Sequence, residues 1–598
     1  MRFAGHTCIG IVLTLLLTSV YTIGQNRRSS PPDEGTEVPA TGTITGRVID
    51  DTGQPVPNAA VFIRTFGSDK SGRAIATNRE GTFQASGLDR EVYFISATAP
   101  AYTTQPRDPD STLEAYYRVG DSVTLVLVKG GVITGSVTTS AEEPVVGVRV
   151  RAQMIRDGNG QAPRYGATFR ENTTDDRGVY RIYGLSTGTY RVMAGGQGGN
   201  PWELTAYDVD APTYFHSSLP DRATEINVRA GEETANVDIR YRGEAGHTVS
   251  GIASGPQSTE PSGFTLTLTS TLDGSSQWSN SSSQPPGNRG FVFSGVADGD
   301  YDIIALSHLP GGTGALSEPK RIRVRGADIT GLEITTKPLG AISGRMVLED
   351  SKAADCKRKR RPLFTETLVS AWHNEKNRPK YQPQFFWYLG GPSSPDKQGN
   401  FSLRNLAPGQ YQLIPRFSAK YWYLHSISLP SSAAQEPKST QANRDVDAAR
   451  NWTTLKTGDR LSGLIIKLSE GAASLQGKIT VSEGEQPPAR LYVYLVPAER
   501  EKADDVLRFF SAPVLADGRI TLSNLPPGRY LILAQPALDN AASPLTKLRL
   551  PDEEETRAKL RRDAEASRTE IEFKPCQNVT DYQLPLKSPL TAAGKGSN

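Results

Sequence analysis

The sequence predicts an all-β protein, a tandem array of about five β-sandwich domains with a short helix near the C-terminus. Three observations support this prediction: a motif that recurs five times, a second motif that opens each copy, and short alternating strands bounded by turn residues. The chain of 598 residues is too long for one hydrophobic core. At roughly 150 residues per domain, its length suggests about four domains, a prior that five small domains satisfy.

The recurring motif places an aromatic or apolar residue first, Leu or Val five positions later, and Tyr after five more. Its copies are Phe83/Leu88/Tyr93, Tyr180/Leu185/Tyr190, Phe291/Val296/Tyr301, Phe401/Leu406/Tyr411 and Ile520/Leu525/Tyr530. Successive motif tyrosines lie 97 to 119 residues apart, which is the length of a small domain and not of a solenoid repeat. The motif therefore indicates a series of related domains.

Around each motif tyrosine the residues are typical of a hairpin. A Gly usually precedes the Tyr by two positions, as Gly188 and Gly409 do, and its tolerance of positive φ favours a turn there. Apolar residues then alternate after the Tyr, which predicts a returning strand. The first domain has Glu91 in place of the Gly, so we expect a different turn. We interpret the tyrosines as packed corner residues and not as ligand contacts.

A second motif opens each domain with a Gly between apolar residues. These glycines are Gly46, Gly135, Gly251, Gly344 and Gly477. A Gly inside a strand marks a bulge or a close backbone approach. Further strand-like segments precede most copies, at 121–128, 327–335 and 461–468. We expect them to close the preceding domain or to bridge to the next one.

The N-terminus has the features of an export signal. Arg2 supplies a positive charge, an apolar stretch follows, and small residues precede a cleavage site before Gln25. The stretch is shorter than the roughly 20 residues of a spanning helix, and no comparable run follows, so we expect a secreted protein that is not membrane-embedded. A retained anchor is the alternative. Cleavage would leave Cys356 and Cys576, and one disulfide between them is a hypothesis.

Residues 44–61 and 77–83, which include Ile-Thr-Gly-Arg-Val and Glu-Gly-Thr-Phe, resemble a carboxypeptidase regulatory-like domain. The second domain resembles it through residues 175–190, and the fourth and fifth domains do so less closely. The third domain is least similar, because Arg289-Gly-Phe291 replaces the usual acidic-x-Gly-x-Phe. The resemblance implies a transthyretin-like, seven-stranded sandwich of the carbohydrate-binding-like group, used as an accessory module of exported bacterial proteins. It implies little about the ligand.

At the C-terminus, Pro551 and an acidic first turn predict a short exposed helix. We divide the chain into a signal peptide (1–24), a linker (25–40), sandwiches at 41–114, 115–229, 230–325, 326–455 and 456–550, a helix with closing strands (551–586) and a disordered tail (587–598). The fourth sandwich carries an insertion, because its two motifs lie farther apart than those of the other domains.

The sequence predicts no enzyme and no cofactor. None of the six histidines is followed by Glu at the third position, which zinc carboxypeptidases require, so we expect no metal site. Ser186 lies in a Gly-x-Ser-x-Gly pattern, but a strand follows where hydrolases need a helix, so it is interpreted as a turn residue. The pairs Asp175/Asp176, Asp298/Asp300 and Asp504/Asp505 are interpreted as turns, with calcium binding as the alternative.

Two aromatic clusters are candidate ligand contacts in the fourth domain. Trp387 and Tyr388 belong to its insertion, and Trp422 and Tyr423 follow its motif tyrosine. Exposed Trp and Tyr rings stack on sugars or anchor protein partners. Core packing of the long fourth domain is the alternative, and we favour it.

We expect a secreted, non-catalytic binding and spacer protein, extracellular, periplasmic or at the cell surface, whose partner is a protein or a glycan. Serial domains can gain avidity when several engage one target. The net charge of +3 is too small to indicate nucleic-acid binding. A carbohydrate-binding protein and an accessory subunit of an extracellular hydrolase are the alternatives. The ligand and the oligomeric state stay open.

Overall fold

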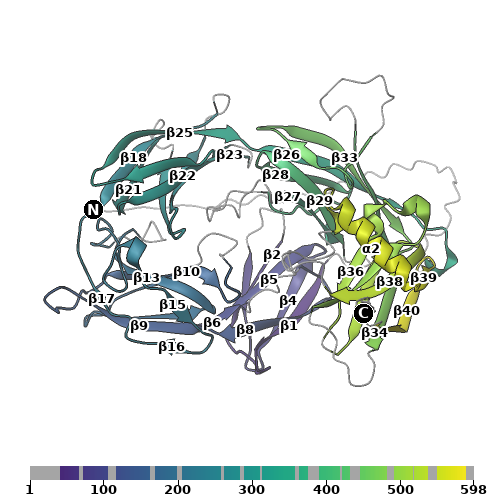
Figure 1. Ribbon diagram of the computed structural model, residues 1–598, viewed down its shortest axis with the longest axis horizontal. Coiled ribbons are helices and arrows are strands. Elements are labelled where there is room, and N and C mark those ends of the chain that lie inside the picture. Colours follow the sequence, from purple (N-terminus) through teal and green to yellow (C-terminus); the bar gives the residue numbers. More distant parts are fainter. Residues whose placement is uncertain are drawn as a thin grey trace, which may run out of the picture. The chain divides into compact units, whose positions relative to one another are not determined.

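The computed structural model describes residues 41–65, 72–104, 116–161, 169–197, 205–256, 261–282, 289–309, 313–356, 363–374, 390–417, 420–430, 445–480, 490–515, 517–536 and 548–586. Strands dominate these ranges, and α2 (Glu554–Ser567) is the one α-helix with described bounds (Figure 1). The predicted all-β fold of tandem sandwiches is therefore confirmed.

In the first two domains, two sheets face each other. One sheet of the first domain has the order β4 (Thr82–Asp89), β1 (Thr41–Asp50), β8 (Ser122–Lys129), β6 (Tyr102–Thr104). Its other sheet has the order β3 (Arg73–Ala76), β2 (Ala60–Thr65), β5 (Val92–Thr98), β7 (Tyr117–Arg118). One sheet of the second domain has the order β12 (Val179–Leu185), β9 (Gly131–Thr138), β16 (Glu233–Thr234), with β17 (Ile239–Arg240) also beside β9. Its other sheet has the order β11 (Phe169–Thr173), β10 (Arg149–Asp157), β13 (Gly188–Ala194), β14 (Thr213–Tyr214), with β15 (Ile226–Val228) also beside β13.

In the third domain a short strand joins the two layers into one continuous eight-stranded sheet. Its order is β20 (Ser276–Ser282), β19 (Gly263–Ser270), β22 (Gly299–His308), β23 (Gly314–Ser317), β25 (Ile329–Pro338), β18 (His247–Ser254), β21 (Gly290–Val296), with β24 (Lys320–Val324) beside β22. The joining strand is β23, which pairs with β22 on one side and β25 on the other.

The last two domains again have two sheets each. One sheet of the fourth domain has the order β28 (Asn400–Leu406), β26 (Gly340–Glu349), β33 (Arg460–Glu470), β30 (Trp422–Leu429), β31 (Val446–Asp447). Its other sheet has the order β27 (Thr367–His373), β29 (Gly409–Phe417), β32 (Thr453–Leu455). One sheet of the fifth domain has the order β37 (Arg519–Leu525), β34 (Ala473–Thr480), β40 (Asn578–Pro585). Its other sheet has the order β36 (Phe510–Pro513), β35 (Leu491–Pro497), β38 (Gly528–Pro536), β39 (Glu570–Phe573).

The two sequence motifs are neighbours in one β-ladder. In every domain the register places the opening Gly opposite the first residue of the recurring motif. The pairs are Gly46 and Phe83, Gly135 and Tyr180, Gly251 and Phe291, Gly344 and Phe401, and Gly477 and Ile520. The two motifs are therefore parts of one repeated structural unit.

A bulge interrupts this ladder at the same point in all five domains, just before the motif Leu or Val. The residue there takes a left-handed conformation and is Gly or Asn, the residue types that tolerate positive φ. These residues are Gly87 (φ 72°), Gly184 (72°), Gly295 (65°), Asn405 (59°) and Asn524 (59°). The left-handed residue common to all five domains thus precedes the Leu or Val. The positive φ expected two positions before the Tyr occurs in the fourth and fifth domains, at Gly409 (φ 154°) and Gly528 (φ 142°).

Each opening strand also pairs in parallel with a strand that closes its domain. The closing strand β8 lies beside β1, β25 beside β18, β33 beside β26 and β40 beside β34. In the second domain, β16 and β17 take this place beside β9. The predicted boundaries after residues 114, 229, 325 and 455 assigned four of these closing segments to the following domain, whereas strand pairing joins them to the preceding one.

Each domain has its own cluster of buried apolar side chains between its sheets. The helix α2 adds a further cluster on the fifth domain, because Leu560 and Ala564 are buried against the outer faces of Tyr494 and Leu533. The helix was expected to be exposed, but one of its faces covers the sheet that contains β35 and β38. Apolar residues four positions apart in a short, charged helix account for this docking.

Candidate functional site

The motif tyrosines have a structural role in every domain. Each phenol hydroxyl donates a hydrogen bond to the carbonyl oxygen four residues earlier, at 2.8 Å in Tyr93, 2.8 Å in Tyr190, 2.9 Å in Tyr301, 2.7 Å in Tyr411 and 2.9 Å in Tyr530. Burial raises the pKa of all five phenols above the ordinary value of tyrosine. Their interpretation as corner residues is confirmed, and they lock the hairpin that carries the bulge.

The opening glycines are structural as well. A Cβ atom built on any of them would overlap a backbone carbonyl oxygen of the segment that closes the domain. The oxygen belongs to Val123 for Gly46, to Leu464 for Gly344 and to Tyr582 for Gly477, with the same relation in the other two domains. The prediction of a close backbone approach is confirmed.

Most of the polar candidates from the sequence also lie in turns. Asp300 is the exception, because it lies in β22 and its carboxylate accepts a hydrogen bond from Arg323 Nη2 at 3.0 Å. Asp175 Oδ1 accepts hydrogen bonds from the backbone nitrogens of Arg177 at 3.0 Å and Val179 at 2.8 Å, and Asp505 accepts one from Leu507 N at 3.1 Å. Ser186 lies between β12 and β13, a strand-to-strand turn, as expected. In the part of the chain that the structure describes, no three His, Cys, Asp or Glu side chains are grouped to hold a metal ion.

The aromatic candidates have different surroundings. Trp422 is only 2% exposed and packs in the core with its ring centroid 5.9 Å from that of Phe364. It therefore has no free face for a sugar ring, so the ligand-contact hypothesis is wrong for Trp422 and the favoured core packing is confirmed. Tyr423 is partly buried beside the ring of His425. Trp387 and Tyr388 lie outside the described residues.

Cys356 and Cys576 are joined by a disulfide across 220 residues of sequence, with their Cα atoms 5.4 Å apart. Cys356 ends a short 3-10 turn after β26, and Cys576 lies between β39 and β40. The bridge therefore links the fourth domain to the fifth.

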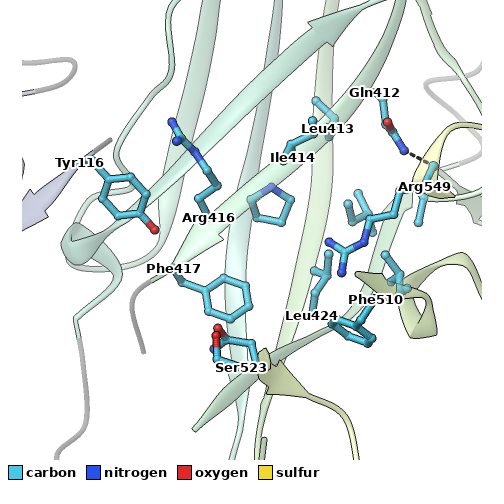
Figure 2. Close-up of a pocket in the computed structure, with 15 residues that line it drawn as sticks. Tyr116, Gln412, Leu413, Ile414, Arg416, Phe417, Leu424, Phe510, Ser523 and Arg549 are labelled. Carbon is cyan, nitrogen blue, oxygen red and sulfur yellow. Dashed lines mark hydrogen bonds between the residues drawn. The ribbon is translucent and has the colours of Figure 1, made fainter. Parts of the chain in front are cut away.

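A pocket of about 320 Å³ lies where side chains of the fourth and fifth domains meet (Figure 2). The fourth domain contributes residues of β29 and β30, and the fifth contributes residues of β36 and β37 together with Leu507 and Arg549. Its walls are mainly apolar, formed by side chains such as Phe417, Leu424, Ile427 and Phe510. The volume falls within the range typical of small-molecule sites.

Arg549 brings a positive charge into this pocket. Its guanidinium carbon lies 5.3 Å from the centroid of the Phe510 ring, and its Nε is buried with no hydrogen-bond partner among the described residues. Burial lowers the pKa of Arg549 to about 10, an effect that the charge of Asp505 partly opposes. Asp505 already forms an ion pair with another arginine, because its carboxylate lies 3.5 Å from Arg508 Nε. Arg549 therefore carries its charge at neutral pH without a close counter-ion among the described residues.

The backbone around Arg549 is held from two sides. Gln412 Nε2 on β29 donates a hydrogen bond to the carbonyl oxygen of Arg549 (Figure 2). From α2, the buried Arg557 donates to Leu548 O at 3.0 Å and to Leu550 O at 2.7 Å. These contacts hold the backbone from which the Arg549 side chain extends into the pocket.

A second cation, Arg416, also lines the pocket, and its guanidinium carbon lies 4.9 Å from the centroid of the Tyr116 ring. The described lining residues include two arginines and neither Asp nor Glu. A site of this composition can bind an anion that carries an apolar body.

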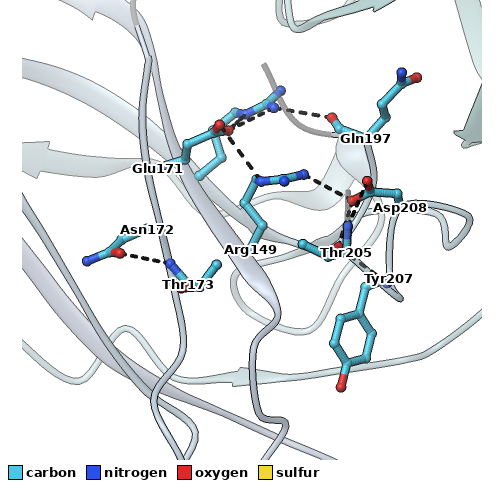
Figure 3. Close-up of polar contacts among 9 residues, drawn as sticks. Arg149, Glu171, Asn172, Thr173, Gln197, Thr205, Tyr207 and Asp208 are labelled. Atoms are coloured by element: carbon cyan, nitrogen blue, oxygen red, sulfur yellow. Dashed lines mark hydrogen bonds and ion pairs between the residues drawn. The ribbon is translucent and has the colours of Figure 1, made fainter. Parts of the chain in front are cut away.

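The buried arginines Arg149 and Arg151 are paired with acids, in contrast to Arg549. In the second domain, Arg149 lies 3.0 Å from Asp208 and 3.8 Å from Glu171, and Arg151 lies 3.0 Å from Glu171 (Figure 3). Asp208 in turn accepts a hydrogen bond from Thr205 Oγ1 at 2.7 Å. This network ties β10 and β11 to the segment before β14, and its compensated charges indicate a structural role.

No sequence motif marks Arg549, Arg416 or Gln412, because the pocket forms from residues that are far apart in the sequence, with Tyr116 contributing beside the fourth and fifth domains. A lone Arg after a polar stretch has no pattern that distinguishes it from a solvated surface residue.

Comparison with known families identifies the first domain. Residues 43–125 match the family of the carboxypeptidase regulatory-like domain. The match extends from β1 into the closing strand β8 and confirms the resemblance found in the sequence. None of the curated proteins matches the chain. In the described part of the chain, no helix has the length and apolar character needed to cross a membrane.

Several solved structures show low similarity to the chain. The shaft pilin SpaA from Lactobacillus rhamnosus GG is 13% identical over 34% of this chain and 98% of that one, with a TM-score of 0.16. BcpA, the major pilin subunit of Bacillus cereus, is 10% identical over 50% and 99%, with a TM-score of 0.14. The Bacillus anthracis TIE protein is 11% identical over 50% and 51%, with a TM-score of 0.13, so the chain spans about half its length. TM-scores this low carry no argument about this protein.

Proposed function

We propose that the protein is a non-catalytic binding and spacer protein that acts outside the cytoplasm, in the periplasm, at the cell surface or in the medium. One observation carries the proposal. The residues that recur in all five domains serve the fold, whereas the pocket with Arg549 occurs in one place. The repeated domains supply length and rigidity, and we assign binding to the pocket that contains Arg549.

Two further features support a location outside the cytoplasm. The N-terminal 24 residues have the composition of an export signal, and the Cys356 to Cys576 disulfide is the kind of bond that persists in oxidising compartments. The match of residues 43–125 to the carboxypeptidase regulatory-like domain supports the scaffold part of this proposal.

The location is tested by producing the full chain with a C-terminal tag and separating cytoplasm, periplasm and medium. We expect a mature protein outside the cytoplasm whose first residue is Gln25. A protein that stays in the cytoplasm with Met1 intact would contradict the proposal. Cross-linking on intact cells with the same tagged chain should then capture a surface protein or glycan, and turnover of any substrate in a broad hydrolase panel would contradict the non-catalytic role.

Carbohydrate binding is the main alternative, and the structure weakens its best candidate because Trp422 is buried. A glycan array with the mature protein decides between the two. Binding to one glycan class that is lost in Tyr423→Ala and kept in Arg549→Met would replace the proposal. Association with a hydrolase in the cross-linking experiment would instead favour an accessory subunit.

A further inference from the structure

We propose that the pocket between β29, β30, β36 and Arg549 binds a small organic acid, with the carboxylate on the Arg549 guanidinium and the apolar body against Phe417, Leu424 and Phe510. This inference rests on the proposed binding role and adds the chemical class of the ligand. It is independent of which surface partner the protein meets.

The charge of the site selects an anion. A buried cation without a close counter-ion is costly, and an incoming carboxylate both compensates the charge and accepts hydrogen bonds. The guanidinium of Arg549 faces the pocket among apolar side chains, as Figure 2 shows. The buried Arg149 and Arg151 show the contrast, since each already has an acidic partner. Arg549 lacks such a partner among the described residues, so a ligand can supply it.

The shape of the guanidinium favours a carboxylate. Its planar fork matches the two oxygens of a carboxylate in a bidentate pair. Gln412 and Arg557 hold the backbone on both sides of Arg549, so little conformational freedom is lost when the pair forms.

The walls select an apolar body. Phe417, Leu424, Ile427 and Phe510 surround a volume of about 320 Å³, which suits a short acyl chain or an aromatic ring. Both domains contribute to these walls, so a bound acid would contact the fourth and the fifth domain at once.

The test is calorimetric titration of the mature, disulfide-bonded protein with sodium octanoate and with 1-octanol, which has the same chain and no charge. We expect one octanoate per chain, bound about tenfold or more tightly than octanol, because a charged hydrogen-bonded pair contributes at least one decade of affinity. Equal affinity for the two probes would overturn the proposal.

The variant Arg549→Met keeps the length of the side chain and removes its charge. We expect it to lose about tenfold or more in octanoate affinity while octanol binding stays. Arg519→Met is the matched control, because Arg519 is an exposed arginine of the same domain that pairs with Asp517. Its octanoate affinity should equal that of the natural protein. Unchanged octanoate binding in Arg549→Met would overturn the proposal.

A second variant keeps the test decisive if Arg549→Met does not fold. Ser523 is an exposed residue of β37 that also lines the pocket, so Ser523→Trp fills the entrance without touching the core. We expect it to weaken octanoate and octanol alike. Octanoate binding that persists in Ser523→Trp would place the anion elsewhere and overturn the proposal. If no titration shows binding while export and surface cross-linking are normal, the ligand class is rejected and the proposed function stands.

Discussion

Gly344 lies where the carbonyl oxygen of Leu464, on the parallel strand β33, leaves no room for a side chain. The variant Gly344→Ala should therefore lower the free energy of unfolding by about 1 to 3 kcal/mol, because the strands must move apart to admit a methyl group. Urea denaturation of the mature protein measures this loss.

Gly391 provides the matched control in the same domain. No atom lies within 4 Å of a Cβ built on it, and its φ is not in the left-handed region. Gly391→Ala should leave stability unchanged or raise it by about 0.4 to 1 kcal/mol, since Ala restricts the unfolded chain. Equal losses in the two variants would contradict the close approach.

The buried phenol of Tyr190 predicts a stability loss in alkaline solution. Burial raises its pKa, so above pH 10 the unfolded chain releases a proton that the folded chain retains. Stability should fall by about 1.4 kcal/mol per pH unit for this tyrosine as pH rises above about 10, until the folded pKa is reached. Unfolding titrations in urea at a series of alkaline pH values measure the slope.

Tyr190→Phe should reduce that slope and cost about 1 kcal/mol at neutral pH through the lost hydrogen bond to Ser186 O. Tyr183→Phe serves as the comparison, because Tyr183 is 49% exposed on the preceding strand β12. This substitution removes no buried hydroxyl. If both variants changed the alkaline slope equally, the corner role of Tyr190 would be rejected.

At the scale of elements, the positions of the strands can be predicted from the sequence more clearly than the pairing between them. The alternation after Tyr190 and the Gly-centred opening motif identify strands because both are local patterns. The parallel pairing of β8 with β1 joins segments some 75 residues apart, since Thr45 lies beside Ser122, and nothing local records it. For this reason the predicted boundaries fell before the closing strands, by two strands in the first two domains and by one in the third and fourth.

The helix α2 shows the same limit. Its acidic first turn was visible in the sequence, but Leu560 and Ala564 could not be assigned to a surface before the sheet of β35 and β38 was known. Leu560→Ala should lower the free energy of unfolding by about 2 to 5 kcal/mol, because Leu560 is fully buried. Lys559→Ala, its exposed neighbour, should change it by less than about 0.5 kcal/mol in the same thermal or urea measurement. A small effect of Leu560→Ala would mean that the helix does not dock.

At the scale of the whole molecule, the candidate site was the least predictable part. The two mature cysteines could be paired by counting, whereas the pocket needs residues of β29, β36 and Arg549 to meet from two domains. Trp422 stayed a candidate ligand contact beside the favoured core packing, because a strand-borne Trp has the same local sequence whether it faces the core or the solvent. Fold-level motifs therefore identified the scaffold and left the site unmarked.

The disulfide gives a prediction at this scale. Thiol labelling of the denatured, unreduced mature protein should find no free thiol, and labelling of both cysteines would reject the bridge. The double variant Cys356→Ser, Cys576→Ser should lose about 2 to 5 kcal/mol in the free energy of unfolding, because the cross-link restricts the unfolded chain. An unchanged denaturation midpoint would show that the bridge contributes nothing to folding.

The same bond has a consequence for a chain that a protease has cut. A protease that cuts the backbone once anywhere between Cys356 and Cys576 opens the chain but leaves both fragments covalently joined. Nicked molecules would migrate as one species until a reductant separates them, so the last two domains can tolerate clipping without shedding either piece.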